Sequence, residues 1–264
     1  MIIYGINPVL EALRSGRVRR VRIGGRGDQR IEEALALARE RGVAVERTDR
    51  GTIDRVAHGG VHQGIVAEID APRDYSLREI VEAAAPDAPL IAVLDGVEDP
   101  HNFGAILRTA DAAGAHGVVR QARHAARLDG VAAKASAGAI AHVRIATEVN
   151  IARAIEALKE LSVWTVGLAG GAAESYDAVD FTLPTAVVLG SEGSGLRRLV
   201  QERCDRLVSI PMRGAVTSLN VSVAAGVVLY EAARQRQKRQ GTGKKRQGDR
   251  EKGQGETACD DEIR

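Results

Sequence analysis

Cysteines, long apolar runs and signal-peptide features are scarce in this sequence, and each absence excludes a class of protein. The two cysteines, Cys204 and Cys259, lie far apart and the second sits in a polar stretch, which excludes a disulfide framework and a cysteine zinc site. No apolar run approaches the ~20 residues that a membrane-spanning helix needs. The opening MIIYGINPVLEALRSG lacks the basic-then-apolar layout of a signal peptide. We therefore expect a soluble cytoplasmic protein with no membrane partner and no metal.

The 264 residues are 44% hydrophobic, which is enough for one large domain or two modest ones. The formal net charge is only +2, but basic residues gather near the end of the chain. Residues 234–252 read RQRQKRQGTGKKRQGDREK, with nine Lys or Arg and no large apolar side chain. Such a segment cannot bury enough surface to offset its ordering entropy, so we predict a disordered basic tail over 237–264. This tail either only keeps the protein soluble or attracts phosphate groups.

Residues 1–70 show a short αβ pattern, which predicts a compact domain. Residues 71–89 contain three prolines, and we interpret them as a linker. The expected helices of the first domain cover 7–15, 29–42 and 51–57, and its expected strands are VRRVRIGG, VAVERTD and GIVAEID.

From 90 to 236 the pattern changes to wholly apolar strand-like runs that alternate with amphipathic helices. Strands that are apolar throughout are covered on both faces, which indicates a parallel sheet flanked by helices, an α/β fold. The predicted strands cover 90–96, 117–119, 142–146, 162–169, 185–190 and 206–211, and the predicted helices 102–114, 128–138, 150–160, 195–203 and 218–236.

The first candidate site follows the strand LIAVLDG, in LDGVEDPHNFGAILRTADAAG. Ligands of open α/β sheets bind beyond the carboxyl ends of strands, so residues at these ends are informative. Asn102 stands where a helix N-cap is expected, which by itself is a structural role. Arg108 lies on the second turn of a helix otherwise made of Ala, Ile and Leu. It is either an ordinary surface residue or needs an anionic partner.

The second candidate is VVLGSEGSGLRR, in which a strand runs directly into a glycine-rich loop, 190–195, and then a helix. Glycines let the backbone approach a ligand closely, and a helix N-terminus favours negative charge. The order differs from the dinucleotide-binding G-x-G-x-x-G, and no P-loop lysine follows. The loop alone is compatible with a tight structural turn or with a ligand loop.

The third candidate is SIPMRGAVTSLNVSVAAGVV, where a strand ends at Pro211 and an irregular loop leads into the last predicted helix. Ser218 can cap that helix, but capping leaves Asn220 and Ser222 without a role. Three polar or glycine-bearing loops that follow three apolar strands indicate one composite pocket.

The three stretches together resemble the SpoU/TrmH family of RNA ribose 2′-O-methyltransferases, in the SPOUT superfamily. The matching motifs are N-x-G-x-x-x-R from Asn102, L-G-S-E-G-x-G from Leu189, and I-P-M-x-G-x-x-x-S-L-N-V-S-V from Ile210, so the resemblance covers roughly 90–236. YGINPVLEAL and HQGIVAEI further resemble the small ribosomal-protein-like RNA-binding domain of the subgroup that methylates a guanosine of 23S ribosomal RNA. The resemblance implies a C-terminal trefoil knot, contrary to the usual rule against threading, and a homodimer.

The resemblance also implies S-adenosylmethionine as methyl donor, with Ser218, Asn220 and Ser222 lining its pocket. Arg108 would bind the target phosphate and the developing alkoxide, because a guanidinium with a pKa above ~12 is ill-suited to accept a proton. Glu192 would orient the reacting groups or balance the sulfonium. The implied catalytic residues are Asn102, Arg108, Glu192 and Asn220, with the two asparagines holding Arg108 and the ribose, and the implied cofactor-binding residues are Leu189, Gly190, Ile210, Ser218 and Leu219. Relatives often carry a glutamate where this chain has Ala141, so residues 134–141 are left out of this set.

Three other functions stay open. The same chemistry on transfer RNA is one, although such relatives usually lack the first domain. A non-catalytic RNA-binding or ribosome assembly factor is another. Nucleotide-phosphate binding through the glycine-rich loop is disfavoured by the missing P-loop lysine.

Overall fold

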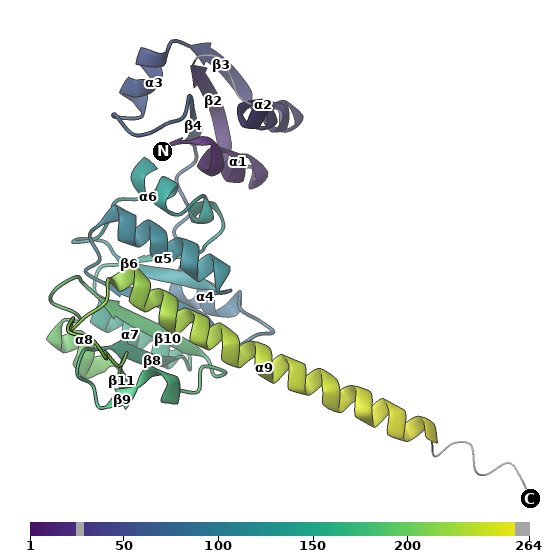
Figure 1. The fold of residues 1–264 in the computed structure, drawn as a ribbon, viewed down its shortest axis with the longest axis vertical. Helices are drawn as coiled ribbons and strands as arrows, with labels where there is room; N and C mark the ends of the chain where they lie inside the picture. The colour runs from purple at the N-terminus through teal and green to yellow at the C-terminus, as the bar shows by residue number, and fades with distance from the viewer. Residues whose placement is uncertain (25–28, 257–264) are drawn as a thin grey trace, which may run out of the picture.

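The computed structural model describes residues 1–24 and 29–256, without the side chains of 240–256, and builds them around two sheets (Figure 1). The first sheet has the order β1-β4-β2-β3 and pairs β2 with β3 in parallel and its other neighbours antiparallel. Its strands are β1 (Ile2–Tyr4), β2 (Val18–Gly24), β3 (Ala44–Thr48) and β4 (Ile65–Ile69), and the helices of this region are α1 (Ile6–Arg14), α2 (Gln29–Glu40) and α3 (Arg50–Val56).

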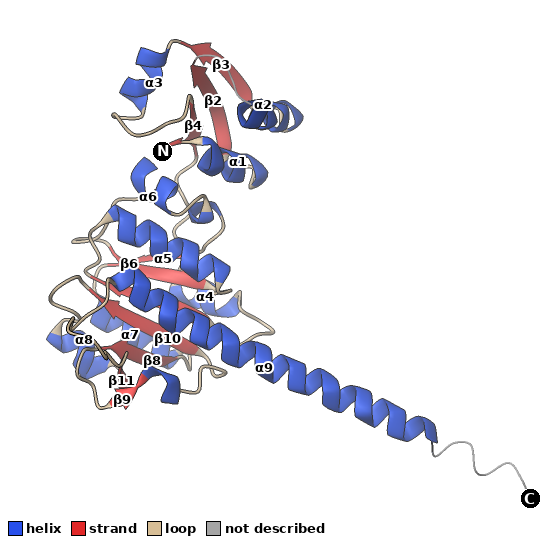
Figure 2. Cartoon of the chain, in the orientation of Figure 1, coloured by secondary structure: helices blue, strands red, loops and turns tan. Residues whose placement is uncertain are grey.

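The second sheet has seven strands in the order β7-β6-β5-β10-β8-β11-β9, and each neighbouring pair is parallel. Its strands are β5 (Leu90–Asp95), β6 (Gly117–Gln121), β7 (Ile145–Glu148), β8 (Trp164–Leu168), β9 (Glu174–Ser175), β10 (Thr185–Gly190) and β11 (Arg206–Ser209). The helices around it are α4 (Leu77–Glu82), α5 (Pro100–Ala112), α6 (Gly130–Ala135), α7 (Ile151–Glu160), α8 (Arg198–Arg203) and α9 (Val221–Glu256), with 3-10 turns at Ala139–Ala141 and Tyr176–Ala178. The predicted α/β fold with a helix-flanked parallel sheet is confirmed (Figure 2).

Both faces of the second sheet are buried, which explains why its central strands are apolar throughout. Along β5, Leu90, Ala92 and Leu94 join one hydrophobic cluster, whereas Ile91 and Val93 join another. Successive side chains of a strand point to opposite faces, so the two clusters lie on opposite sides of the sheet.

Strand β5 is also the point where the strand order reverses. The chain proceeds from β5 outward through β6 to β7 on one side, whereas β10 and β8 lie on its other side. Ligands of open α/β sheets bind at the carboxyl ends of strands at such a reversal. The register pairs Gly190 with Asp95, so the loops that follow β5 and β10 leave the sheet side by side.

Helix α6 lies between the two sheets and connects them (Figure 1). The Tyr4 ring packs so closely over Gly130 that a Cβ there would lie 2.4 Å from a ring carbon. Lys134 Nζ, on the same helix, donates a hydrogen bond to Val61 O at 2.7 Å. The first domain therefore rests directly on the second. The predicted linker, 71–89, also contacts the second sheet, because α4 buries Leu77 and Ile80 in one of its clusters.

The last helix departs from the sequence-based expectation. It continues to Glu256, whereas we predicted an end at 236 and a disordered tail over 237–264. The prediction considered only burial, and the helix continues through a segment that holds good helix formers, Lys, Arg and Gln, together with five glycines, so propensity alone does not explain its length. Residues 257–264 lie outside the described residues.

Four further expectations concern membrane-spanning helices, metal binding, the knot and the location of the protein. No helix in the described part of the chain is both long and apolar enough to cross a bilayer. Among the described side chains, those of 1–24 and 29–239, no cluster of metal-ligating groups occurs. The trefoil knot and the cytoplasmic location stay predictions.

Candidate functional site

The glycine-rich loop after β10 folds back onto the end of its own strand. Ser191 N donates to Gly195 O at 3.1 Å, and Gly195 N donates to Ser191 O at 3.0 Å. A Cβ on Gly190 would lie 2.1 Å from Gly195 C and 2.2 Å from Leu196 N. Any residue larger than glycine at 190 would therefore push the loop away from the strand.

A hollow of about 310 Å³ lies against this loop. It is formed by the carboxyl ends of β8, β10 and β11 and by the segment that leads into α9. The five residues expected to bind the cofactor all line it: Leu189, Gly190, Ile210, Ser218 and Leu219. The structure thus brings the second and third motifs together around one cavity.

The first motif joins the other two through a hydrogen-bond network, which we call the amide network: Asn102, Glu192 and Asn220. Asn220 Nδ2 donates to Asn102 Oδ1 at 3.0 Å and to Glu192 Oε1 at 3.5 Å. Asn102 Nδ2 also donates to Glu192 Oε1. Asn102 is only 8% exposed, and burial of an amide requires such partners. Three of the four predicted catalytic residues therefore lie together.

The N-cap of α5 differs from the expected one, and this difference leaves the Asn102 side chain free for the site. Asp99, not Asn102, is the N-cap of α5, and it accepts from His101 N at 3.1 Å and Asn102 N at 3.4 Å. Burial raises the pKa of Asp99, but hydrogen bonds from Asn102 and His101 outweigh this effect and lower it overall. Because Asp99 caps the helix, the Asn102 side chain is available to Glu192.

At α9, Asn220 takes the capping role that we expected of Ser218. Helix α9 begins at Val221, and Asn220 Oδ1 accepts from Ser222 N at 2.9 Å and from Ser222 Oγ at 2.6 Å. Ser218 lines the hollow instead. We expected Asn220 and Ser222 to line the pocket, but neither is among the residues that line this hollow, and the Ser222 hydroxyl is directed to Asn220. The amide of Asn220 thus both caps the helix and joins the amide network.

Arg108 does not take part in this network. It is exposed on α5 and does not line the hollow. Its side chain has no hydrogen bond or ion pair among the described residues, so the expected contacts from the two asparagines to Arg108 are absent. The asparagines bond each other and Glu192. The role predicted for Arg108 stays a prediction.

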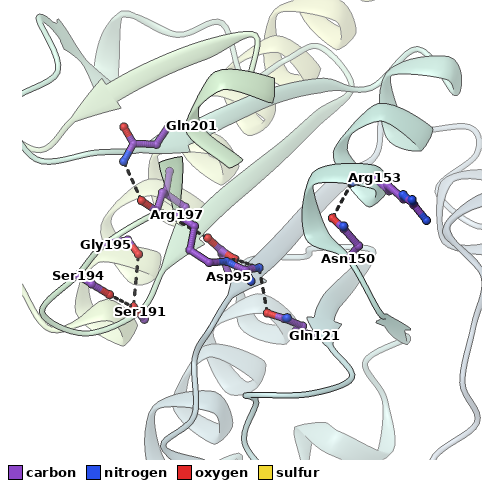
Figure 3. Close-up of polar contacts among 10 residues, drawn as sticks. Asp95, Gln121, Asn150, Arg153, Ser191, Ser194, Gly195, Arg197 and Gln201 are labelled. Carbon is purple, nitrogen blue, oxygen red and sulfur yellow. Dashed lines mark hydrogen bonds and ion pairs between the residues drawn. The ribbon is translucent and has the colours of Figure 1, made fainter. Parts of the chain in front are cut away.

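Sequence reasoning missed a second polar cluster beside the loop, Asp95, Gln121 and Arg197 (Figure 3). Asp95 is fully buried as a side chain and accepts from Arg197 N at 2.9 Å and from Arg197 Nε at 2.7 Å. Gln121 Oε1 accepts from Arg197 Nη2 at 3.0 Å. The cluster fixes the exit of the glycine-rich loop to the ends of β5 and β6. A carboxylate that ends an otherwise apolar buried strand needs a cationic partner, and this signal was present in the sequence.

Comparison with known proteins gives family matches over both domains. A model of the SpoU rRNA Methylase family matches residues 89–230, and a model described as RNA 2′-O ribose methyltransferase substrate binding matches residues 2–75. The 23S rRNA (guanosine-2′-O-)-methyltransferase RlmB of Escherichia coli is 42% identical over 239 residues, 89% of this chain and 98% of that protein. An uncharacterized tRNA/rRNA methyltransferase of Mycolicibacterium gilvum is 44% identical over 242 residues, 89% of this chain and 76% of that one. The crystal structure of the SpoU methyltransferase AviRb from Streptomyces viridochromogenes with AdoMet superposes with a TM-score of 0.75 at 27% identity, covering 89% of this chain and 90% of that one.

Proposed function

Because the chain belongs to the SpoU rRNA methylase family, we propose that it transfers a methyl group from S-adenosylmethionine to the 2′ hydroxyl of a guanosine in 23S ribosomal RNA. One observation carries this proposal: three loops converge so that the amide network lies beside a hollow lined by the glycine-rich loop. The match of residues 2–75 to a substrate-binding model supports an RNA-binding role for the first domain, which we place at 1–70. We place the methyltransferase domain at 90–236.

The residues of the hollow fit S-adenosylmethionine. Gly190 lines the hollow and lets the loop fold back against the end of β10, because a methyl group there would strike the loop. Leu189, Ile210 and Leu219 offer apolar surface for an adenine ring, and Ser218 offers a hydroxyl. The volume of about 310 Å³ falls within the range of small-molecule sites. When bound, S-adenosylmethionine supplies an electrophilic methyl group on a sulfonium.

The protein's own contribution is alignment and charge stabilisation. A ribose hydroxyl is not ionised near neutral pH, so its oxygen must be held in line and the charge that develops on it must be stabilised. Arg108 binds the phosphate next to the target ribose and stabilises the developing alkoxide. Its guanidinium cannot accept the proton, which passes to phosphate or water. Asn102 and Asn220 orient the ribose, held in place by Glu192.

A homodimer completes this proposal. Val223 and Tyr230 lie seven residues apart on α9, so they share one face, and they are 51% and 55% exposed. Helix α9 packs beside α5, which carries Arg108. A second copy that covers the apolar face would bring Arg108 close to the subunit boundary. Tyr230→Lys should shift the mass measured by light scattering from dimer to monomer; a monomeric native chain would refute the proposed dimer.

Methyl transfer from labelled S-adenosylmethionine tests the function directly. The purified full-length chain is incubated with 23S ribosomal RNA transcripts and with transfer RNA, and primer extension at low dNTP concentration locates the modified ribose. We expect label at one guanosine of 23S RNA. Label on no RNA would refute methyl transfer by this chain.

Transfer RNA is the second candidate substrate, because a relative 44% identical is named as a tRNA/rRNA methyltransferase. Label on transfer RNA alone would favour it. A non-catalytic RNA-binding or assembly factor would bind RNA without binding S-adenosylmethionine, and isothermal titration calorimetry with the cofactor distinguishes this alternative.

A further inference from the structure

A second hollow, of about 580 Å³, adjoins the one assigned to the cofactor. Ser191, Glu192 and Ser194 of the glycine-rich loop line both hollows. The second hollow extends from this loop to the residues that follow β5 and to Gln121 at the end of β6. A ligand in it would lie next to Glu192 and therefore next to the amide network.

The charges of this hollow exclude an anionic occupant. Its wall contains one guanidinium, that of Arg197, and four carboxylates, those of Asp95, Glu98, Asp99 and Glu192. Such an excess of negative charge repels a phosphate group. The described residues also contain no cluster suited to a metal ion. The wall therefore favours an occupant that presents hydrogen-bond donors.

Three of the four carboxylates are already engaged by the protein. Asp95 accepts from Arg197, and Asp99 accepts from backbone N–H groups at the start of α5. Glu192 accepts from the two amides of the amide network. Each of these groups thus has its partners within the fold.

Glu98 is the exception. Its side chain is 64% exposed, and its one contact in the described part of the chain is with His124 Nδ1, at 3.5 Å from Glu98 Oε1. A carboxylate has two oxygens and about four acceptor positions. Glu98 therefore keeps acceptor capacity for a ligand.

Arg197 offers donors in the same wall. Its Nε and Nη2 are directed to Asp95 and Gln121, which hold the planar guanidinium from two sides (Figure 3). Its Nη1 has no hydrogen bond with a described residue, so two N–H donors remain. A guanidinium fixed in this way is preorganised for recognition of an acceptor edge.

We propose that the second hollow receives the base of the target guanosine, with Arg197 Nη1 donating to O6 and N7 and the Glu98 carboxylate accepting from N1–H and the 2-amino group. The inference rests on the proposed function and adds to it the choice of base. Guanine carries acceptors at O6 and N7 and a donor at N2, whereas adenine has an amino group at the place of O6 and no 2-amino group. Adenine would therefore place its 6-amino group against Arg197 and turn the acceptor N1 toward Glu98, which would have no donor to bind.

Single-turnover methyl transfer to RNAs that differ only at the target nucleotide tests this assignment. The nucleotides are guanosine, inosine, which lacks the 2-amino group, and adenosine. The proteins are the native chain, Glu98→Ala and the control Glu160→Ala, which removes an exposed carboxylate at the end of α7. Glu98 is exposed in a loop, so its removal leaves the core intact.

We expect the native chain and the control to prefer guanosine over inosine by roughly tenfold or more, the usual discrimination of a good base-edge contact. In Glu98→Ala this preference should fall to about one, because the partner of the 2-amino group is gone. Equal rates on guanosine and inosine in the native chain, or a preference that survives in Glu98→Ala, would overturn the inference alone. Absence of transfer to every RNA would overturn the proposed function and this inference with it.

Discussion

Substitution of Gly190 by alanine tests whether the folded-back loop forms the cofactor site. Gly190 ends β10, and the loop that it begins returns over it. The new methyl group would lie 2.1 Å from Gly195 C, whereas ordinary contact begins at 3.4 Å. The loop backbone must therefore retreat by about 1.3 Å, the difference between these distances, because the atoms that the methyl group meets belong to the main chain and cannot rotate away.

The magnitude follows from the bonds that this retreat breaks. The two backbone hydrogen bonds between Ser191 and Gly195, at 3.1 and 3.0 Å, hold the loop closed. Each contributes about 0.5–1.5 kcal/mol, so opening the loop costs about 1–3 kcal/mol. If binding of S-adenosylmethionine requires the closed loop, the affinity should fall by about fivefold to 150-fold, since about 1.4 kcal/mol corresponds to one factor of ten.

Gly42→Ala is the matched control, and calorimetry with S-adenosylmethionine is the assay. Gly42 has φ +66°, no heavy atom lies within 4 Å of the position that a Cβ would take, and it does not line the hollow, so alanine there strains the backbone without affecting the site. It should cost about 1–2 kcal/mol of stability and leave the cofactor affinity within about twofold. Equal affinities of the two variants would refute the idea that the closed loop forms the site.

Other predictions concern single side chains. Arg108→Ala should lower turnover at saturating RNA by roughly a hundredfold to a thousandfold and leave cofactor affinity unchanged; near-native turnover would remove Arg108 from the mechanism. Burial raises the pKa of Asp205, but hydrogen bonds from Lys159 and Thr165 outweigh burial and lower the pKa below its reference value of 3.8. The charged Asp205 carboxylate therefore stabilises the fold above pH 3.8, and this stabilisation is lost as the pH falls through the pKa of the folded state. Asp205→Asn should thus cost about 1–3 kcal/mol in urea unfolding at pH 7, with the gap closing in acid; a gap that persists in acid would contradict this. Burial raises the pKa of the Cys204 thiol to about 12, so in a variant whose other cysteine is serine, alkylation at pH 8 should be at least about a hundredfold slower in native than in unfolded protein.

The parallel sheet was predictable because its central strands contain continuous runs of apolar residues. Strand β10 places Val187 and Leu189 in one cluster and Ala186 and Val188 in the other, so these four consecutive positions are all apolar. Such a run has no alternation and indicates burial on both faces. Strands β1 and β9 span only three and two residues, which is too short for any periodicity, and both were missed.

The start of α5 was misplaced although its signal was present. Asp99 and Asn102 are both good N-cap residues, three positions apart. Pro100 decides between them, since proline is favoured at the first helical position and follows Asp99 directly. The proline thus marks the beginning of the helix more reliably than the asparagine does.

The meeting of distant loops was predictable, but the choice of partners within the site was not. The carboxyl ends of parallel strands share one edge of the sheet, which brings the motifs of Asn102, Glu192 and Asn220 together. Which donor reaches which acceptor depends on side-chain rotamers and on the caps, and neither is visible in the spacing of motifs. The motifs therefore led us to place Arg108 among the asparagines, whereas the two asparagines form their hydrogen bonds with each other and with Glu192.

This arrangement gives the proposed role of Arg108 a physical reason. The Glu192 carboxylate is directed to two amides, so it does not neutralise the Arg108 guanidinium. Within the described residues Arg108 keeps all five of its N–H donors, and it is exposed to solvent on α5. An arginine paired to Glu192 would have to give up that ion pair before it could bind a phosphate. An arginine held apart from the carboxylate binds the RNA backbone at no such cost. We therefore expect Glu192→Gln to leave the contribution of Arg108 to RNA affinity unchanged in a double-mutant cycle. A coupling energy above about 1 kcal/mol would show that the two charges act on each other.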